Sequence, residues 1–378
     1  MNILIAPNAF KNSLDARSVA DAIAQGLNQS KLNGYYHTFP IADGGDGTGK
    51  LLIEHLKGEQ ISAGAHDALG RPVTTHFGLA DNGHTAIVEM ADASGLHLLN
   101  TAELNPMQAN SYGTGQLIKA ALDQGVSKII IGMGGSATVD GGVGILSALG
   151  IKFFNRQGDE LAPTPAALAE LHYIDTTNLD HRVFKAEIMI LCDVDNQLLG
   201  TEGAAAMFGP QKGASPDDVV KLNTFLSDMA AIALKQTGKD MAAIKHSGTA
   251  GGAAAGMYAF LNARLVAGAD NFLKLTGFDE ALQDIDVVIT GEGSIDGQTL
   301  HGKAPAAVAM IAKQRGIKVL GVAGRVPTKP SVQLNQWFDK LISINKTPVH
   351  LDAALKNTRQ NLISTAKEIG DWLVDGKD

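Results

Sequence analysis

The strongest constraint on the fold of this 378-residue chain is the alternation of short apolar segments with helical patterns. Ile3 to Ala6 has the composition of a buried strand, and Ser13 is a suitable N-cap for a helix after it. That helix would bury Val19, Ile23 and Leu27 on one face. The same order recurs with strand-like segments at 36–41, 128–131, 188–192, 287–290 and 319–322. We therefore predict an α/β fold with parallel sheets, whose loops after the strands hold ligands.

The length and one change of pattern predict a second domain. A chain of this size exceeds one comfortable hydrophobic core. Between about 62 and 88, the segments 72–77 and 85–88 flank Asp81-Asn82-Gly83, a turn signal that predicts an antiparallel strand pair. This region differs from the strand-helix units around it and indicates a separate domain.

Charge and aromatic content argue against a nucleic-acid partner. The formal net charge is -8, and the lysines and arginines form no cluster that could release counterions from a phosphate backbone. Aromatic residues make up 5% of the chain, which gives little support for base stacking. We expect a small-molecule ligand and no nucleic acid.

The cysteine content and the apolar segments predict a cytoplasmic protein. Cys192 is the single cysteine, so no internal disulfide is possible, which fits a reducing compartment. Its apolar surroundings predict a buried structural thiol. Met1 to Pro7 lacks the basic and apolar regions of a signal peptide, and no apolar stretch is long enough to cross a membrane. We expect no membrane partner.

Two loops near the N-terminus are suited to anion binding. Lys11 follows the first strand and precedes a helix N-terminus, where free N–H groups favour anions. The loop at 42–48 contains Asp43, Gly44 and Gly45, and glycines let backbone amides approach a ligand closely. A surface lysine and a flexible turn are the alternative interpretations.

The second of these loops resembles a P-loop without completing its pattern. Residues 44–50 follow G-x-x-x-x-G-K, but Leu51 stands where a P-loop has the Ser or Thr that binds magnesium. We therefore expect Lys50 to lie on a solvated helix face.

A third glycine loop follows the strand-like segment 128–131. Residues 132–137 match the dinucleotide pattern G-x-G-x-x-A, which raises a dinucleotide-dependent oxidoreductase as a competing function. Asn155 stands at the next strand end, where that pattern requires an acid, so we do not favour this function. The loop, with Gly134, Gly135 and Ser136, is either a phosphate-binding loop or a structural turn.

Carboxylates follow two later strands. Asp193 and Asp195 project to the same side if the chain is extended, and such a pair either holds magnesium or caps a turn with Asn196. Glu292 and Asp296 lie in a glycine loop beyond the strand at 287–290. The pair at 251 and 252 (Gly251, Gly252) precedes a predicted helix at 253–261 and serves either close ligand approach or tight helix packing.

Taken in order, these loops resemble the type I glycerate kinases along nearly the whole chain. The opening 6–14 is similar to the family's P-D-S-F-K-G-S-L, and 40–48 to its P-x-A-D-G-G-E-G-T. Further matches follow at 67–72, 112–115, 134–138, 192–196, 208–214 and 291–293, and at Asp296, Gln298, Gly302, Lys303 and Pro305. The chain departs from the family pattern at Asn8, Asp46, Val139 and Ser294, where the family has Asp, Glu, Asn and often Arg.

The resemblance implies transfer of the ATP γ-phosphoryl group to D-glycerate, usually at the 2-hydroxyl, with Mg²⁺ as cofactor. A kinase of the 3-hydroxyl or of another small hydroxy acid is the nearest alternative. A ligand-binding regulator without turnover is a distant alternative, motivated by Asn8 and Val139. Asn8 cannot act as a general base, and Ser294 cannot supply a cation to the phosphoryl group.

The resemblance also implies the domain organisation. Residues 1–62 and 283–378 would form a discontinuous flavodoxin-like domain, and residues 63–282 an inserted α/β domain. The active site would lie in a cleft between them. A homodimer is compatible with the sequence, which does not fix the oligomeric state.

Individual roles follow from the same resemblance. We assign Lys11, Asp193 and Asp296 to catalysis, and Asp195 and Glu292 to magnesium. Substrate binding is assigned to Ser13, Arg71, Ser94 and Lys303. Nucleotide or phosphate binding is assigned to Asp43, Gly44, Gly45, Gly134, Gly135, Ser136, Gly251 and Gly252. Lys11 and Lys303 would neutralise phosphate or carboxylate charge.

Overall fold

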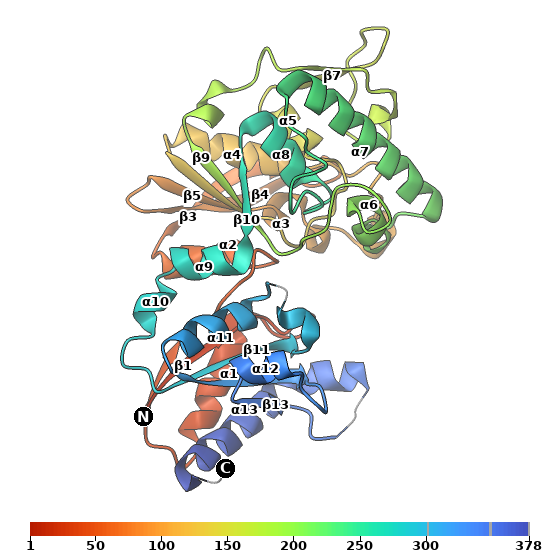
Figure 1. Ribbon diagram of the computed structural model, residues 1–378. Helices are drawn as coiled ribbons and strands as arrows, with labels where there is room; N and C mark the ends of the chain where they lie inside the picture. The colour runs from red at the N-terminus through yellow and green to blue at the C-terminus, as the bar shows by residue number, and fades with distance from the viewer. Residues whose placement is uncertain (301, 348–349, 377–378) are drawn as a thin grey trace. The chain divides into compact units, whose positions relative to one another are not determined.

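The chain forms two compact α/β units, which confirms the predicted fold class. The computed structural model describes residues 1–300, 302–347 and 350–376. The first unit consists of Met1–Asp43 and Ala269–Asp378, and the second of Gly44–Gly268 (Figure 1). Each unit is built around its own sheet.

The first unit contains a five-stranded sheet made from both ends of the chain. Its strands are β1 (Asn2–Pro7), β2 (Tyr35–Thr38), β11 (Val287–Ser294), β12 (Lys318–Arg325) and β13 (Lys340–Ser343). They lie in the order β13-β12-β11-β1-β2, and all neighbours are parallel. Numbered along the unit, this order is 2-1-3-4-5, which is that of flavodoxin-like folds. The predicted flavodoxin-like domain is therefore confirmed.

Helices alternate with the strands of the first unit along the chain. They are α1 (Ala16–Asn28), α9 (Gly268–Leu275), α10 (Phe278–Ala281), α11 (Ala304–Gln314), α12 (Val332–Trp337) and α13 (Leu351–Asp375). Helices α1 and α13 lie side by side and share a core with β1, β11 and β12 (Figure 1). Val19, Ile23 and Leu27 are buried in this core, as predicted.

The predicted start of α1 was wrong. Asp15 is the N-cap, and its carboxylate accepts a hydrogen bond of 2.7 Å from the N–H of Ser18. Ser13 lies in a tight turn instead, where its N–H donates to the carbonyl of Phe10 at 2.9 Å. Both residue types cap helices well, so the local sequence could not distinguish them.

The second unit contains a six-stranded mixed sheet. Its strands are β3 (Glu59–His66), β4 (Pro72–Ala80), β5 (Thr85–Glu89), β6 (Lys128–Gly132), β9 (Glu187–Cys192) and β10 (Arg264–Ala267), in the order β10-β9-β6-β5-β4-β3. The neighbours from β10 to β5 are parallel, whereas β4 is antiparallel to both β5 and β3. The predicted antiparallel pair around Asp81 to Gly83 is therefore confirmed. A separate small sheet pairs β7 (Lys152–Phe154) with β8 (Tyr173–Asp175).

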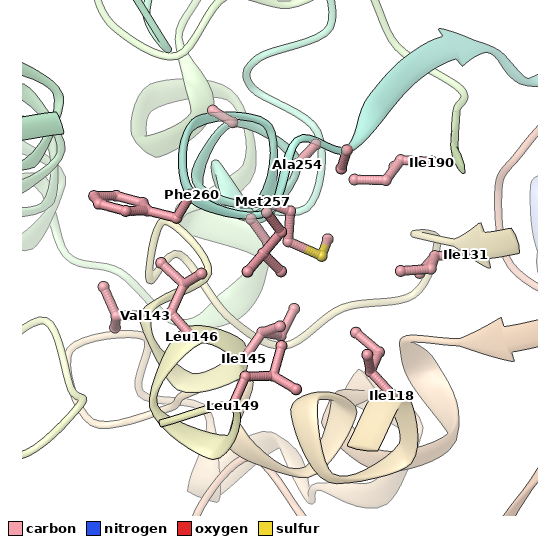
Figure 2. Close-up of a cluster of buried hydrophobic side chains, with 14 of the residues drawn as sticks. Ile118, Ile131, Val143, Ile145, Leu146, Leu149, Ile190, Ala254, Met257 and Phe260 are labelled. Carbon is pink, nitrogen blue, oxygen red and sulfur yellow. The ribbon is translucent and has the colours of Figure 1, made fainter. Parts of the chain in front are cut away.

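Helices of the second unit enclose a large apolar core. They are α2 (Thr48–His55), α3 (Ala91–Ser94), α4 (Tyr112–Asp123), α5 (Val143–Ala148), α6 (Ala204–Phe208), α7 (Pro216–Thr237) and α8 (Ala253–Leu261). Figure 2 shows how side chains of α4, α5 and α8 meet those of β6 and β9, among them Ile118, Ile131, Leu146, Ile190, Met257 and Phe260. This core fixes the ends of the loop between β6 and α5. Within the described residues, no helix combines the length and the apolar character that membrane crossing requires.

Cys192 lies at the end of β9 in the core of the second unit, where it is 3% exposed. Burial raises the pKa of its thiol to about 12. A thiol with this pKa stays protonated and is a poor nucleophile. The prediction of a buried structural cysteine is confirmed.

The compact units divide the chain at residues other than the predicted 62/63 and 282/283. Residues 44–62 fall in the second unit because α2 packs on β4 and β5 and because β3 continues the second sheet. The predicted domain bounds, and the predicted cleft between the domains, stay predictions.

Candidate active site

In the first unit, polar residues gather where β1 and β11 end. The N–H of Asn8 donates to the carbonyl of Gly291 at 2.8 Å, and its side-chain amide donates to Asp43 at 3.0 Å. These bonds join the loop after β1, the end of β11 and the segment after β2. In a sheet with the order 2-1-3-4-5, this edge is the switch point at which ligands bind.

Glu292 is the central acid of this edge. Its side chain is buried, and its Oε1 accepts a 2.9 Å hydrogen bond from the hydroxyl of Thr299. The ammonium of Lys303 lies 3.9 Å from the same oxygen. Burial raises the pKa of Glu292 to about 7; Lys303, Thr299 and Lys11 act against this rise, and Asp43 adds to it. The structure therefore brings together four predicted site residues: Lys11, Asp43, Glu292 and Lys303.

Asp296 follows Glu292 at the start of a short 3-10 helix, Gly297–Leu300. Its carboxylate accepts hydrogen bonds from the N–H of Gln298 at 2.8 Å and from the hydroxyl of Ser294 at 3.4 Å. Its own N–H donates to the hydroxyl of Thr299 at 3.1 Å, and that hydroxyl in turn contacts Glu292. Asp296 thus caps a turn, and its predicted catalytic role stays a prediction.

Ser13 has its hydroxyl engaged within the first unit. The hydroxyl donates to the carbonyl of Leu355 on α13 at 2.7 Å. A substrate would have to share or replace this hydrogen bond. The assignment of Ser13 to substrate binding stays a prediction.

In the second unit, residues 44–48 of the second loop pack directly on the third glycine loop at 132–137. The N–H of Met133 donates to the carbonyl of Gly44 at 3.2 Å. A Cβ added to Gly134 would lie 2.0 Å from the backbone nitrogen of Asp46, so only glycine fits there. Gly44 has φ +94° and faces the carbonyl of Leu191. The predicted phosphate residues Gly44, Gly45, Gly134 and Gly135 therefore lie together, and chain packing alone already requires glycine at two of them.

Glu89 binds the backbone at the end of the loop at 42–48, and it was not among the predicted site residues. It is buried at the end of β5 and accepts hydrogen bonds from the N–H groups of Gly47 at 2.6 Å and Gly49 at 2.5 Å. Burial raises its pKa to about 7, against those two hydrogen bonds. Its position directly after the apolar segment 86–88 is the sequence feature that could have identified Glu89 as a site residue.

Lys212 holds the third glycine loop and was also missed as a site residue. Its side chain is 3% exposed, and its ammonium donates to the hydroxyl of Ser136 at 2.9 Å and to the carbonyl of Thr138 at 2.7 Å. Burial lowers its pKa to about 7, although Asp140 and Asp193 act to raise it. The family match at 208–214 includes Lys212, but it does not indicate that this lysine contacts Ser136.

Asp140 fixes the far end of the same loop. Its carboxylate is fully buried and accepts hydrogen bonds from the N–H and hydroxyl of Ser111, at 2.8 and 2.7 Å, and from the N–H of Gly142 at 3.0 Å. Burial raises the pKa of Asp140. Because α5 begins only at Val143, the glycines at 132–135 do not open a helix, as a dinucleotide fingerprint requires.

Gly251 and Gly252 adopt left-handed φ values of +65° and +86° before α8. A Cβ at Gly251 would lie 2.3 Å from the carbonyl oxygen of Thr138, and one at Gly252 would lie 2.6 Å from Leu198. Tight packing against Thr138 therefore explains Gly251, and the left-handed φ favours glycine at both positions. Their assignment to nucleotide binding stays a prediction.

The carboxylates after β9 are exposed. Asp193 influences Lys212 electrostatically, as described above. Asp195 Oδ1 lies 3.3 Å from the ammonium of Lys245 and 3.0 Å from Nδ1 of His246. In the described part of the chain, no group of three or more His, Cys, Asp or Glu side chains converges on a possible metal position. The metal roles of Asp195 and Glu292 stay predictions.

Arg71 and Ser94 of the second unit are engaged with neighbouring residues. The guanidinium of Arg71 donates to Asp67 at 2.5 Å and to Glu103 at 2.7 Å. Ser94 is buried, and its hydroxyl lies 2.8 Å from that of Thr114. Their assignment to substrate binding is not tested by these contacts. Lys50, by contrast, lies on the exposed face of α2, as predicted.

Comparison with known proteins identifies the family. Residues 3–374 match the family model described as the glycerate kinase family. The chain belongs to the glycerate kinase family. It is 41% identical over 369 residues to a glycerate kinase of Bacillus subtilis (strain 168), covering 98% of this chain and 97% of that protein. It is 38% identical over 376 residues to the glycerate 2-kinase of Escherichia coli (strain K12), covering 100% and 99%.

A solved structure supports the same assignment. The crystal structure described as a glycerate kinase 2 from Salmonella typhimurium LT2 has a TM-score of 0.83 and 40% sequence identity. It covers 100% of this chain and 99% of that one. The resemblance seen in the sequence is therefore confirmed, and the chain is a kinase.

Proposed function

We propose that this chain transfers the γ-phosphoryl group of ATP to the 2-hydroxyl of D-glycerate, giving 2-phosphoglycerate and ADP. The observation that carries the proposal is the full-length similarity to glycerate kinases, including a glycerate 2-kinase. The cluster of Lys11, Asp43, Glu292 and Lys303 at the switch point of the first sheet supports it.

Phosphoryl transfer needs charge neutralisation and alignment more than covalent chemistry. We assign charge neutralisation to the ammonium groups of Lys11 and Lys303. The backbone amides of the two packed glycine loops, with Asp43 and Ser136, would cradle phosphate oxygens. Lys212 would keep the third glycine loop in the shape that this requires.

The attacking hydroxyl also needs a proton acceptor. Asp193 is our candidate, because it is an exposed carboxylate at the carboxyl end of β9, where α/β sheets place their ligands. Asn8 occupies the position of the family's usual Asp and cannot accept a proton in this way.

Magnesium fits the oxygen ligands that these loops present. Mg²⁺ in kinases is held by one or two carboxylates together with substrate phosphates and water, so a cluster of three protein ligands is not required. We assign Glu292 and Asp195 to it. When bound, the ion would neutralise charge on the β- and γ-phosphates. Glu292, whose pKa is about 7, would have to be ionised to bind it.

Substrate recognition is the least constrained part of the proposal. Ser13, Arg71 and Ser94 remain our candidates for glycerate contacts, and each would have to share or exchange a hydrogen bond that it makes now. Gly251 and Gly252 remain candidates near the nucleotide.

A coupled assay tests the reaction and its regiochemistry. The purified chain is supplied with ATP, Mg²⁺ and D-glycerate, and enolase is added without phosphoglycerate mutase. A signal with enolase alone is expected, because enolase accepts 2-phosphoglycerate and not the 3-isomer. A signal that appears only after mutase is added would make the chain a 3-kinase. No glycerate-dependent ADP formation would favour a regulator or a kinase of another hydroxy acid.

We further propose that the chain acts in the cytoplasm on small molecules, without a nucleic-acid or membrane partner. Its net charge of -8 argues against a nucleic-acid partner. A homodimer is the oligomeric state that we propose, and light scattering after gel filtration tests it directly.

A further inference from the structure

Two loops of the first unit line a cavity of about 770 Å³. One loop follows β11 and the other follows β12 and leads into α12. The side chains that line the cavity from the first loop are Asp296, Gln298 and Leu300. Ser331 lines it from the end of the second loop, and Gln333 and Trp337 line it from α12. Figure 1 labels β11, which precedes the first loop, and α12, which follows the second.

The cavity lies at the edge of the sheet where α/β proteins bind ligands. Strands β11 and β12 are parallel neighbours, so their carboxyl ends meet at one edge, and both lining loops leave from that edge. A second cavity, lined by residues 282–285 with Arg315 and Ile317, lies before the same two strands, at their amino ends. The topology therefore favours the first cavity as a ligand site.

The lining has the chemistry that a purine base requires. Trp337 and Leu300 offer apolar surface against which a flat aromatic ring can pack. The amides of Gln298 and Gln333 each carry donors and an acceptor, which suit the mixed edge of adenine. The carboxylate of Asp296 is an acceptor only and suits the hydroxyl groups of a ribose.

A short chain of contacts connects this cavity to the charged cluster of the candidate active site. The N–H of Asp296 donates to the hydroxyl of Thr299 at 3.1 Å, and that hydroxyl donates to Glu292 at 2.9 Å. Lys303 lies 3.9 Å from Glu292. Contacts through Thr299 and Glu292 therefore connect a residue that lines the cavity to Lys303, which we assign to charge neutralisation.

We propose that this cavity holds the adenosine part of ATP. The base packs between Trp337 and Leu300, the ribose hydroxyls donate to Asp296, and the phosphates extend toward Lys303. Asp296 then binds nucleotide and does not take part in the chemical step. This inference rests on the proposed function, and it adds the position of the nucleoside, which nothing in the family similarity assigns.

Tryptophan fluorescence tests the site without turnover. The chain has two tryptophans, and the other, Trp372, lies on α13 with the ammonium groups of Lys318 and Lys340 at 5.7 and 3.9 Å from its ring. The variant Trp372→Phe therefore leaves Trp337 as the single reporter. We expect adenosine and ADP to change its fluorescence saturably, and tripolyphosphate, which lacks the base, to leave it unchanged. In Trp337→Phe, ADP should leave the remaining signal unchanged.

Kinetics give a second, independent reading. Trp337→Ala should raise the KM for ATP at least tenfold and leave the KM for glycerate within twofold, because only the nucleoside loses a contact. The inference is overturned if Trp372→Phe turns over normally while saturating ADP leaves Trp337 fluorescence unchanged. It is also overturned if folded Trp337→Ala keeps the wild-type KM for ATP. Should Trp337→Ala fail to fold, the fluorescence result decides.

Failure of the proposed function gives a different pattern. In that case the wild-type chain forms no ADP with glycerate, yet ADP still changes the fluorescence of Trp337 if the nucleoside site is correct.

Discussion

Each of the two units buries an ionisable side chain near groups of opposite charge, but the side chain is an acid in one unit and a lysine in the other. The first unit buries an acid, Glu292, near lysines, whereas the second buries a lysine, Lys212, near acids. In both cases burial moves the pKa to about 7, and the neighbouring opposite charges act against that shift. Each unit thus holds a group that changes charge close to neutral pH.

The difference lies in how firmly each group is held. Lys212 donates two direct hydrogen bonds of 2.7 and 2.9 Å to a single loop. Glu292 accepts one from Thr299, and its nearest ammonium lies 3.9 Å away. A group with several short bonds fixes a loop, while a group with spare acceptor capacity can still take a ligand. We infer that Lys212 positions the loop and that Glu292 binds ligand.

The largest effect should come from the proposed base. Asp193→Asn should lower kcat by about 100-fold or more, because general bases contribute on that order, and leave the KM for ATP within threefold. Steady-state kinetics at saturating substrates measure this, with circular dichroism as the check on folding. A kcat within threefold of wild type would show that Asp193 is not the base.

Glu292→Gln should give the next effect. The variant should lose about tenfold or more in kcat/KM, since an amide neither ionises nor holds magnesium well. Wild-type kcat/KM should also rise with pH through about 7, because the carboxylate of Glu292 loses its proton there. That acid limb should be absent in Glu292→Gln. Glu280, an exposed acid of the same unit, changed to Gln, serves as the matched control, which should keep the acid limb.

Lys212→Met should act more weakly and on ATP alone. Loss of the ammonium frees Ser136 and Thr138, so we expect the KM for ATP to rise about fivefold while the KM for glycerate stays within twofold. Lys239→Met is the matched control, because Lys239 also donates to a carbonyl, that of Tyr258, but does not contact the glycine loops. Equal effects of both variants would contradict a specific role for Lys212.

The same variant should change how stability depends on pH. Between pH 7 and 10.5 the folded state has lost the Lys212 proton while the unfolded state keeps it, so the wild type gains stability as pH rises. The gain is at most about 1.4 kcal/mol per pH unit. Urea unfolding of wild type and Lys212→Met at several pH values measures the difference, which should grow in favour of the wild type. A constant difference would contradict the lowered pKa.

Lys50→Ala should have the smallest effect. Lys50 completes a near P-loop pattern in the sequence but lies on the exposed face of α2. The KM for ATP should therefore stay within twofold of wild type. A tenfold rise would restore the P-loop interpretation and would remove the contrast between Lys50 and Lys212.

The sequence by itself determined the fold class, the main strands and the family. Apolar periodicity is local, so the strands at 3–6, 128–131 and 287–290 and the buried face of α1 could be predicted from it. The predicted helix at 253–261 coincides with α8. The glycine loops could also be located, because glycine marks positive φ and close approach.

Tertiary structure alone decided which charged groups are buried and what they contact. Lys212 reaches Ser136 across 76 residues, and Glu89 reaches Gly49 across 40, so no local pattern predicts either contact. Arg71 and Ser13 also have partners that the sequence did not predict. Desolvation depends on which distant segments pack together, and it is the largest cause of the pKa shifts of Glu292 and Lys212. For this reason the sequence identified the loops, and only the packing of those loops set the charge of their side chains.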